Sequence, residues 1–317
     1  MYAPVMLFTY SRPTHTRRVL EALAENTLAK ETDVYAYTCL PKNESHRESV
    51  DATKDVLREY ASTGRFRTFT IVDKPTFRPL GPAMVEAVSE VIDKHGRIIV
   101  VEDDIVTSPH YLEFMNLCLD YYEKSHYVFS ISGYSPDLEC LSHLADDVYL
   151  VHRACPWGWG TWADRWEKYS WDVPDYQKSM KDRKLRKRLR EWNIDLPMTL
   201  DALFYEKGCM DKNWEQQFCY CQCMNDMSVV CPKKSLVENI GFDGSGTHEV
   251  PTGLGDTFDP TIDKWDLKPL CIDAGLQKKY NKMFVFRMKT RFMLSASNIV
   301  FTISPKLYYT FLEKYYR

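Results

Sequence analysis

The chain has 317 residues, of which 44% are hydrophobic and 27% charged, so it can form one large α/β domain or two small ones with a sizeable core. No stretch of about 18 uncharged apolar residues occurs, which excludes a spanning helix, and the N-terminal sequence MYAPVMLFTY has neither a basic leader nor an apolar run of signal-peptide length. The ten cysteines are therefore expected to be reduced thiols of a cytoplasmic protein and not a disulfide scaffold.

Strands and helices are predicted to alternate over the first third of the chain. Apolar runs predict strands, and amphipathic stretches predict helices, the first of which Thr14 is expected to cap. The predicted strands cover 4–10, 33–39, 67–72 and 97–101, and the predicted helices cover 15–26, 48–62 and 79–94. This alternation predicts an α/β fold with an open, mainly parallel sheet, helices on both faces and right-handed crossovers. Ligands of such sheets bind beyond the carboxyl ends of the strands.

The pattern changes at about Val148. Five tryptophans fall between Trp157 and Trp171, few strands are predicted, and a charged helix follows. We expect an α+β acceptor-side region (148–275) that continues the nucleotide-sugar-binding half (1–147) within one domain (1–275). Residues 276–317 form a basic, aromatic-rich helical tail with nine basic residues and one acidic residue, although the whole chain has a formal charge of −3.

Three consecutive carboxylates, Glu102, Asp103 and Asp104, follow the most apolar predicted strand. We call them the acidic triplet. Like charges this close repel unless a cation neutralises them, and a hard divalent ion such as Mg²⁺ or Mn²⁺ takes oxygen ligands and completes its shell with phosphate. The alternative is a solvated acidic loop or a charge cluster at a helix N-terminus, with Ser108 as the cap and Pro109 at the first helical position.

These motifs resemble those of GT-A glycosyltransferases, a Rossmann-like fold, in particular the N-acetylglucosaminyltransferase I family with its bacterial relatives. The resemblance runs in order from Pro4 to His248. It covers the opening strand with LFTYSRPT, the triplet within IVVEDDI followed by SPHYLEFM, the turn PWGWGTW at 156–162, Trp214-Glu215, and the loop SLVENIGFDGSGTH at 235–248.

The resemblance implies a role for each matching residue. Asp104 would be the ligand of Mn²⁺ or Mg²⁺, Glu102 and Asp103 would hold the sugar and ribose hydroxyls of the donor, and Arg12 would pair with its diphosphate. The other donor-binding candidates are Tyr10, Trp157, Gly158 and His248. The resemblance implies a UDP-sugar as the donor. Cys39 stands at or near the position at which relatives often carry an Asp that hydrogen-bonds to uracil, so this contact would be missing here.

An inverting transfer also needs a base to take the proton of the acceptor hydroxyl. The acidic triplet is committed to metal and donor, so the base must come from the second half. Glu215 is the first candidate because Trp214-Glu215 resembles the Trp-Asp catalytic motif of the relatives, and Asp211 is the second. The implied reaction transfers a hexose, with N-acetylglucosamine as the default, to a glycan or lipid-linked acceptor in surface polysaccharide biosynthesis.

Several alternatives remain open. A sugar-1-phosphate nucleotidyltransferase would need a Gly-rich phosphate loop after the first strand, and a non-catalytic carbohydrate-binding protein could share the fold. The run Cys219-x-Cys221-x-Cys223 is interpreted as core thiols and not a metal site. Trp162 and Trp166 are interpreted as core residues four apart on one helix, whereas Trp157–Gly160 suits either a packed turn or sugar stacking.

Two basic segments also have more than one interpretation. The helix at 181–190 is interpreted as a solvated face, with an acceptor phosphate site as the alternative; no nucleic-acid partner is expected, because no recognised module is present. The tail suits a peripheral membrane contact on anionic lipid or a pair of helices packed on the domain.

Overall fold

The structure of the protein is a computed structural model that describes residues 1–205, 214–243, 257–283, 296 and 299–316. The strands are β1 Val5–Phe8, β2 Asp33–Cys39, β3 Thr68–Lys74, β4 Arg97–Glu102, β5 Ile105–Thr107, β6 Val128–Ser132, β7 Val148–Val151, β8 Trp159–Trp162, β9 Ser228–Pro232 and β10 Val237–Asn239. The helices are α1 Pro13–Ala24, α2 Arg47–Ser62, α3 Leu80–His95, α4 Tyr111–Tyr121, α5 Glu139–Ser142, α6 Ala163–Trp166, α7 Pro174–Ser179, α8 Arg183–Trp192, α9 Leu196–Tyr205, α11 Glu215–Met224, α12 Ala274–Met283 and α14 Pro305–Tyr316.

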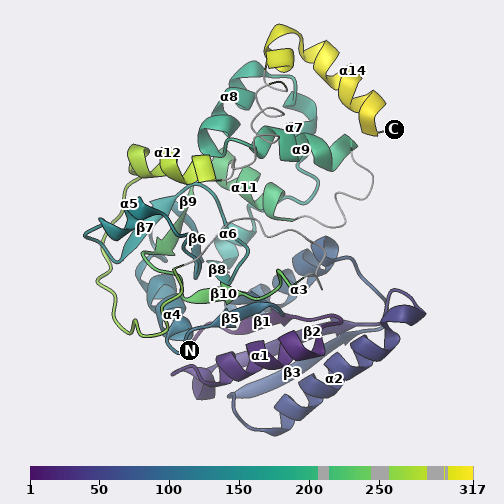
Figure 1. The fold of residues 1–317 in the computed structure, drawn as a ribbon, viewed down its shortest axis with the longest axis vertical. Helices are drawn as coiled ribbons and strands as arrows, with labels where there is room; N and C mark the ends of the chain where they lie inside the picture. The colour runs from purple at the N-terminus through teal and green to yellow at the C-terminus, as the bar shows by residue number, and fades with distance from the viewer. Residues whose placement is uncertain (206–213, 244–256, 284–295, 297–298, 317) are drawn as a thin grey trace.

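Eight strands form one sheet in the order β3-β2-β1-β4-β8-β6-β9-β7 (Figure 1). The strands β3, β2, β1 and β4 are parallel, β8 runs antiparallel between β4 and β6, β9 is parallel to β6, and β7 closes the sheet antiparallel to β9. The predicted mostly parallel α/β sheet is confirmed, and each strand and helix predicted in the first third of the chain is present with ends that differ by a few residues.

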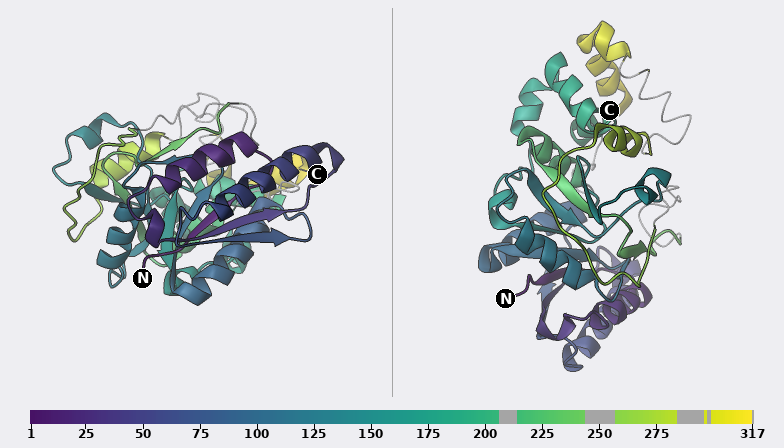
Figure 2. Two further views of the ribbon diagram at one scale, coloured as in Figure 1. Left: turned by 90° about the horizontal axis from the view of Figure 1, so that it is seen from below. Right: turned by 90° about the vertical axis from the view of Figure 1, so that its left-hand side faces the viewer.

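The sheet is covered on both faces, because side chains of a strand alternate between its two sides. On β1, Val5 and Leu7 pack in one core with α1, α2 and α4. Met6 and Phe8 pack in the other core with α3, α11 and the helices of the second half. Figure 2 shows α1 and α2 together on one side of the strands. All four β1 residues are buried, as a parallel strand between two helical layers requires.

Several local predictions were wrong. Helix α1 begins at Pro13, a position that suits proline's fixed φ, so Arg12 precedes the helix and Thr14 lies inside its first turn. After the acidic triplet the chain forms β5, and α4 begins only at Tyr111 with His110 before it, so Ser108 and Pro109 do not start a helix.

The second half contributes β7, β8 and β9 to the main sheet, more strand than its sequence predicted. Trp162 ends β8 and Trp166 lies in the short helix α6; both are core residues, as expected, but they do not share a helix. Tryptophan-rich β8 forms a strand because it lies between β4 and β6, and tertiary pairing of this kind overrides local patterns.

The helices α7, α8, α9 and α14 gather at the end of the molecule opposite α1 and α2 (Figure 1). Helix α12 packs on β7 and β9 through Leu276 and Tyr280, so the expected boundary after residue 275 falls inside a helix that covers the sheet.

Candidate functional site

The candidate site lies at the carboxyl ends of β1 and β4. Phe8 is in register with Glu102 on β4, so the chain leaves both strands at the same edge of the sheet. Tyr10 and Arg12 follow β1, and the acidic triplet follows β4. Two motifs that lie about ninety residues apart in the sequence therefore meet, because parallel strands end together.

Arg12 faces the acidic triplet directly. Its Nη1 donates a hydrogen bond to Asp104 Oδ2 at 2.8 Å and lies 3.6 Å from Asp103 Oδ1. The backbone N–H of Tyr10 donates to Asp103 Oδ2 at 3.4 Å. The side chains of Arg12, Asp103 and Asp104 are 19%, 13% and 16% exposed, so the pairs are largely desolvated while a ligand can still reach them.

The triplet carries more negative charge than Arg12 balances. Burial raises the pKa of Glu102 well above its usual range, the Asp104, Asp103 and Glu215 carboxylates raise it further, and Arg12 lowers it. Burial and then the Asp104 charge raise the pKa of Asp103 to about 7, against a smaller lowering by Arg12. A cation bound beside these groups would relieve the repulsion.

The chemistry of the donor atoms fits a hard divalent cation. The triplet offers carboxylate oxygens only, the ligands that Mg²⁺ and Mn²⁺ prefer. Within the described residues, no group of three or more His, Cys, Asp or Glu is arranged to hold a metal ion. An ion at Asp104 would therefore take most of its ligands from water or a bound phosphate, which is usual for Mg²⁺.

A segment of the second half, residues 239–243, lies against Asp104. Strand β10 pairs antiparallel with β5, and Ile240 then donates its backbone N–H to the Asp104 carbonyl at 2.9 Å. Gly241 donates its N–H to Asn239 Oδ1 at 2.7 Å. A Cβ at Gly241 would collide with Asp104 Oδ2, so only glycine lets the backbone come this close to the carboxylate.

Helix α1 holds the same segment from the other side. His15 Nε2 lies 3.2 Å from Asp243 Oδ2 and 3.3 Å from the Ile240 carbonyl oxygen. The Asp243 charge also raises the pKa of Arg12. Sequence reasoning missed His15, Gly241 and Asp243. The resemblance over 235–248 was the signal that could have located Gly241 and Asp243.

Trp157 and Gly158 precede β8 at the same edge of the sheet. The β4–β8 ladder runs from Arg97 opposite Trp162 to Val100 opposite Trp159, so the residues before Trp159 lie toward the acidic triplet. The Trp157 ring makes edge contacts with Phe242, at a centroid distance of 5.7 Å, and with Tyr134, at 4.6 Å. Trp157 thus lies beside the segment that covers Asp104.

Gly158 has a backbone reason to be glycine. Its φ is +63°, and a Cβ would lie 3.0 Å from Tyr111 Oη and 3.0 Å from Val237 Cγ1. Left-handed φ and close packing both exclude larger residues. Its role in donor binding stays a prediction.

Glu215, predicted as the base, lies within electrostatic range of Glu102 in the acidic triplet. It is the first residue of α11, where the helix dipole favours a carboxylate. The preceding Trp214 packs on Trp159 of β8, with ring centroids 5.1 Å apart, and this contact holds the start of α11 against the sheet. The Glu215 charge is close enough to raise the pKa of Glu102. The alternative base Asp211 and the donor candidate His248 lie outside the described residues.

A second arginine, which sequence reasoning missed, lies near Glu215. Arg153 follows β7, and its Nη1 is 2.5 Å from Asp195 Oδ1, with side chains 17% and 13% exposed. The Asp195 and Glu215 charges both favour its charged form. The only sequence signal was a basic residue two positions after an apolar run, Val148–Val151.

Tyr10 is held by polar contacts to the loop after β2. Its hydroxyl accepts a hydrogen bond from the Lys42 backbone N–H at 2.8 Å and lies 2.9 Å from His46 Nδ1. Its ring centroid is 5.6 Å from that of Phe77. Tyr10 therefore links the acidic triplet, through its backbone N–H, to the loop after β2, through its hydroxyl.

The thiols at the end of β2 and on α11 are packed in the core. Cys39, at the end of β2, is 2% exposed, and burial raises its pKa, so it does not supply the negative charge of an Asp. Burial likewise raises the pKa values of the three thiols on α11 to about 12, 11 and 11, in the order Cys219, Cys221 and Cys223. The interpretation as core thiols is confirmed.

Comparisons with known proteins give distant likenesses. No family model matches the chain, and no curated protein matches it. Two similar solved structures are crystal structures of S. aureus TarS, one of them of residues 1–349, with TM-scores of 0.43 and 0.44 and sequence identities of 12% and 11%. The match to the structure of residues 1–349 covers 76% of this chain and 61% of the TarS chain. The match to the other structure covers 77% of this chain and 37% of the TarS chain. The function must therefore be argued from the geometry of the site.

Proposed function

We propose that the chain is a metal-dependent glycosyltransferase of the GT-A type that transfers a sugar, with inversion, from a nucleotide-diphosphate sugar. One observation carries the proposal: the acidic triplet at the carboxyl edge of a parallel sheet faces Arg12 on one element and comes close to Glu215 on another. The transfer needs carboxylates to bind the metal ion, a guanidinium to bind the diphosphate, and a separate carboxylate to accept the proton of the acceptor hydroxyl.

Asp104 would hold Mn²⁺ or Mg²⁺, and the bound ion would supply electrostatic stabilisation of the departing diphosphate. Arg12 would pair with phosphate oxygens, since its planar fork suits them, and would exchange part of its present contact with Asp104 for this one. Glu102 and Asp103 would accept hydrogen bonds from sugar and ribose hydroxyls. The raised pKa values of Glu102 and Asp103 favour their protonated forms in the free protein. Binding of a cation and of the donor hydroxyls would favour the ionised forms instead.

Glu215 would act as the general base. The acceptor hydroxyl oxygen would attack the anomeric carbon while its proton passes to the Glu215 carboxylate. The bond between that carbon and the diphosphate oxygen would break, and the nucleoside diphosphate would leave with the electron pair. Glu215 is the first residue of α11, a position at which the helix dipole stabilises a carboxylate.

The walls of the site suggest how the donor is held. Trp157 would border the sugar, since aromatic faces pack against sugar rings, and Tyr10 would border the nucleoside. UDP is the proposed nucleotide and a glycan or lipid-linked hydroxyl the proposed acceptor. Gly241 would keep the segment 239–243 close over Asp104, so that water is excluded from the diphosphate.

A thermal-shift panel of nucleotide sugars with and without Mn²⁺ tests the donor half of the proposal. A ligand that binds only the native state raises its melting temperature by mass action. We expect one nucleotide-diphosphate sugar to stabilise the chain only when Mn²⁺ is present, and Asp104→Asn to abolish that shift. Glu238→Gln is the matched control, because Glu238 is an exposed carboxylate on β10 beside the same segment, and it should keep the shift.

Steady-state transfer tests the base. Glu215→Gln should lower turnover by about 10²–10⁴ while donor affinity is unchanged, as expected for a lost general base. If Asp211→Asn does this and Glu215→Gln does not, the base is Asp211. Formation of a nucleotide sugar from a sugar 1-phosphate would instead indicate a nucleotidyltransferase, and glycan binding without donor hydrolysis would indicate a non-catalytic protein.

A further inference from the structure

Four large apolar side chains near the C-terminus are exposed and share one spacing. Ile299, Ile303, Leu307 and Phe311 follow one another every four residues, with exposed fractions of 58%, 72%, 59% and 59%. Residues 299–303 are helical, and hydrogen bonds from Ser304 N–H to Val300 O and from Tyr308 N–H to Ser304 O continue the helical pattern into α14. Ile299 and Ile303 belong to the helical residues 299–303, and Leu307 and Phe311 belong to α14, with Ser304 between the two segments. Within each segment a spacing of four places the two side chains on one side of the helix. We call all four side chains the outer stripe.

The opposite side of these helical turns is buried. Phe301, Tyr308, Tyr309 and Leu312 are 2%, 3%, 3% and 8% exposed and form a core cluster of their own, which Met180 and Tyr205 complete. Helix α14 is therefore apolar on two sides, and only one of them is used to dock on the domain. An ordinary amphipathic helix would place polar residues on the second side.

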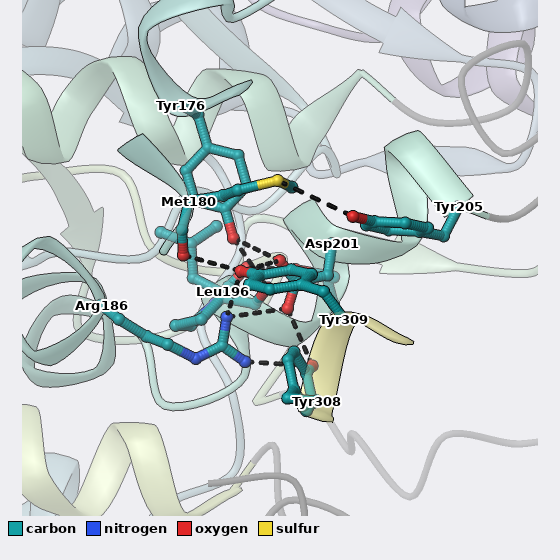
Figure 3. Close-up of polar contacts among 10 residues, drawn as sticks. Tyr176, Met180, Arg186, Leu196, Asp201, Tyr205, Tyr308 and Tyr309 are labelled. Carbon is teal, nitrogen blue, oxygen red and sulfur yellow. Dashed lines mark hydrogen bonds and ion pairs between the residues drawn. The ribbon is translucent and has the colours of Figure 1, made fainter. Parts of the chain in front are cut away.

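A buried ion pair fixes which side of α14 faces inward (Figure 3). Asp201 of α9 accepts hydrogen bonds from Arg186 Nη1 of α8 at 2.7 Å and from the Tyr308 hydroxyl at 2.8 Å, and the Tyr309 hydroxyl lies at 3.2 Å. The Arg186 guanidinium also lies 4.2 Å from the centroid of the Phe301 ring. Rotating the helix to bury the outer stripe would break these contacts and leave a buried charge, which is costly.

Basic side chains lie on α14 itself and on the neighbouring start of α8, whereas Glu313 is the one exposed acidic side chain among the described residues of α14. Lys306 and Lys314 of α14 are exposed, and Lys181 Nζ lies 5.8 Å from the centroid of the Tyr309 ring, which brings the start of α8 next to α14. Lys184 and Lys187 of α8 are exposed as well, and Lys187 Nζ lies 3.7 Å from Glu191 Oε1 on the same helix. Figure 1 shows α8 and α14 together at one end of the molecule. Apolar side chains bordered by lysines are typical of a helix that lies in a membrane interface.

We propose that this end of the molecule docks on an anionic lipid bilayer. Ile303, Leu307 and Phe311 enter the boundary between headgroups and acyl chains, and the neighbouring lysines contact headgroup phosphates. Among the described helices none is long and apolar enough to cross a membrane, so the helix lies along the surface. A second copy fits this face less well, because a two-fold contact would bring the same lysines together. The inference does not rest on the proposed function.

Vesicle flotation of the full chain tests the docking. The probes are vesicles of phosphatidylcholine alone and vesicles of equal parts of phosphatidylcholine and phosphatidylglycerol. The chain should float with the anionic vesicles, and its binding to them should weaken as the salt concentration is raised. Each basic residue near the surface strengthens binding about fivefold at low ionic strength. The double variant Leu307→Ser with Phe311→Ser should weaken binding by about tenfold or more, because it removes two side chains that lipid would bury.

The matched control is Leu117→Ser with Tyr121→Ser on α4, where the side chains are 41% and 44% exposed and away from the lysines. It should bind like the unmodified chain, and circular dichroism should show that both double variants are folded. Lys306→Glu with Lys314→Glu should lose the preference for anionic vesicles.

Equal flotation of the outer-stripe variant and the control would overturn the proposal. So would self-association, seen by sedimentation velocity, that is lost in the outer-stripe variant while flotation stays absent throughout. Donor-dependent thermal shifts are measured on the same preparations. A chain that floats but binds no nucleotide sugar would refute the proposed function and leave the docking intact.

Discussion

The buried pair between Arg186 and Asp201 offers a test of how α14 is attached to the domain. The side chains are 2% and 1% exposed, and the Asp201 carboxylate also accepts a hydrogen bond from the Tyr176 hydroxyl at 2.7 Å. Asp201→Asn keeps the size of the side chain and removes its charge. Arg186 cannot give up its proton, so it would remain charged in the core without a counter-ion.

Breaking a buried ion pair by removing one partner typically costs about 3–5 kcal/mol in the free energy of unfolding. The hydroxyls of Tyr308 and Tyr309 point at the same carboxylate, and an amide nitrogen in its place would face them as a donor, so the upper part of that range is expected. For a chain of this size, about 2 °C of melting temperature corresponds to 1 kcal/mol, so the upper part of the range gives a decrease of about 8–10 °C.

Urea denaturation followed by circular dichroism gives the free energy, with Asp226→Asn as the matched control. Asp226 pairs at 2.9 Å with Arg188, two residues from Arg186 on α8, but these side chains are 77% and 39% exposed. That variant should lose less than about 1 kcal/mol, as is usual for an exposed pair. If Asp201→Asn costs no more than Asp226→Asn, the pair does not anchor α14, and the fixed orientation of the outer stripe loses its support.

Three further outcomes are expected. Burial lowers the pKa of His152 from its ordinary 6.5 to about 4, so the unfolded chain takes up a proton first. The contribution of His152 to the free energy of unfolding is complete above about pH 6.5 and falls as the pH drops toward 4, and denaturation curves of His152→Gln should lack this contribution. Gly241→Ala should cost about 1–3 kcal/mol of stability and weaken Mn²⁺-dependent donor binding in titration calorimetry, because the methyl group displaces Asp104; unchanged binding would contradict the close approach. A thiol reagent should modify exposed Cys271 before the thiols of α11, which should react only after unfolding, and Cys271→Ser should remove the part of the fast phase that this thiol contributes.

The sequence by itself determined the first half of the molecule. The buried strands β1 and β4 are uninterrupted apolar runs, and such runs between helical stretches form a parallel sheet with little choice of topology. Because parallel strands end at one edge, Arg12 and the acidic triplet could be expected to meet, and they do, at 2.8 Å. The local hydrophobic pattern locates the two strands, and their parallel direction places their carboxyl ends at one edge. The meeting of Arg12 and the triplet could therefore be predicted without knowledge of a long-range contact.

Only the tertiary structure decided how the second half completes the site and where the tail lies. The insertion of β8 between β4 and β6 depends on pairing partners that are distant in sequence, and its Trp159 then holds Trp214 and the start of α11. The approach of Gly241 to Asp104 follows from the pairing of β10 with β5. The composition of the tail did not distinguish a helix that contacts a membrane from helices that pack on the domain, because both can contain the same lysines and aromatic residues. The Arg186–Asp201 pair selects the inner side of α14, and this selection leaves the outer stripe exposed, since a buried charge fixes orientation more strictly than apolar side chains present on both sides of the helix.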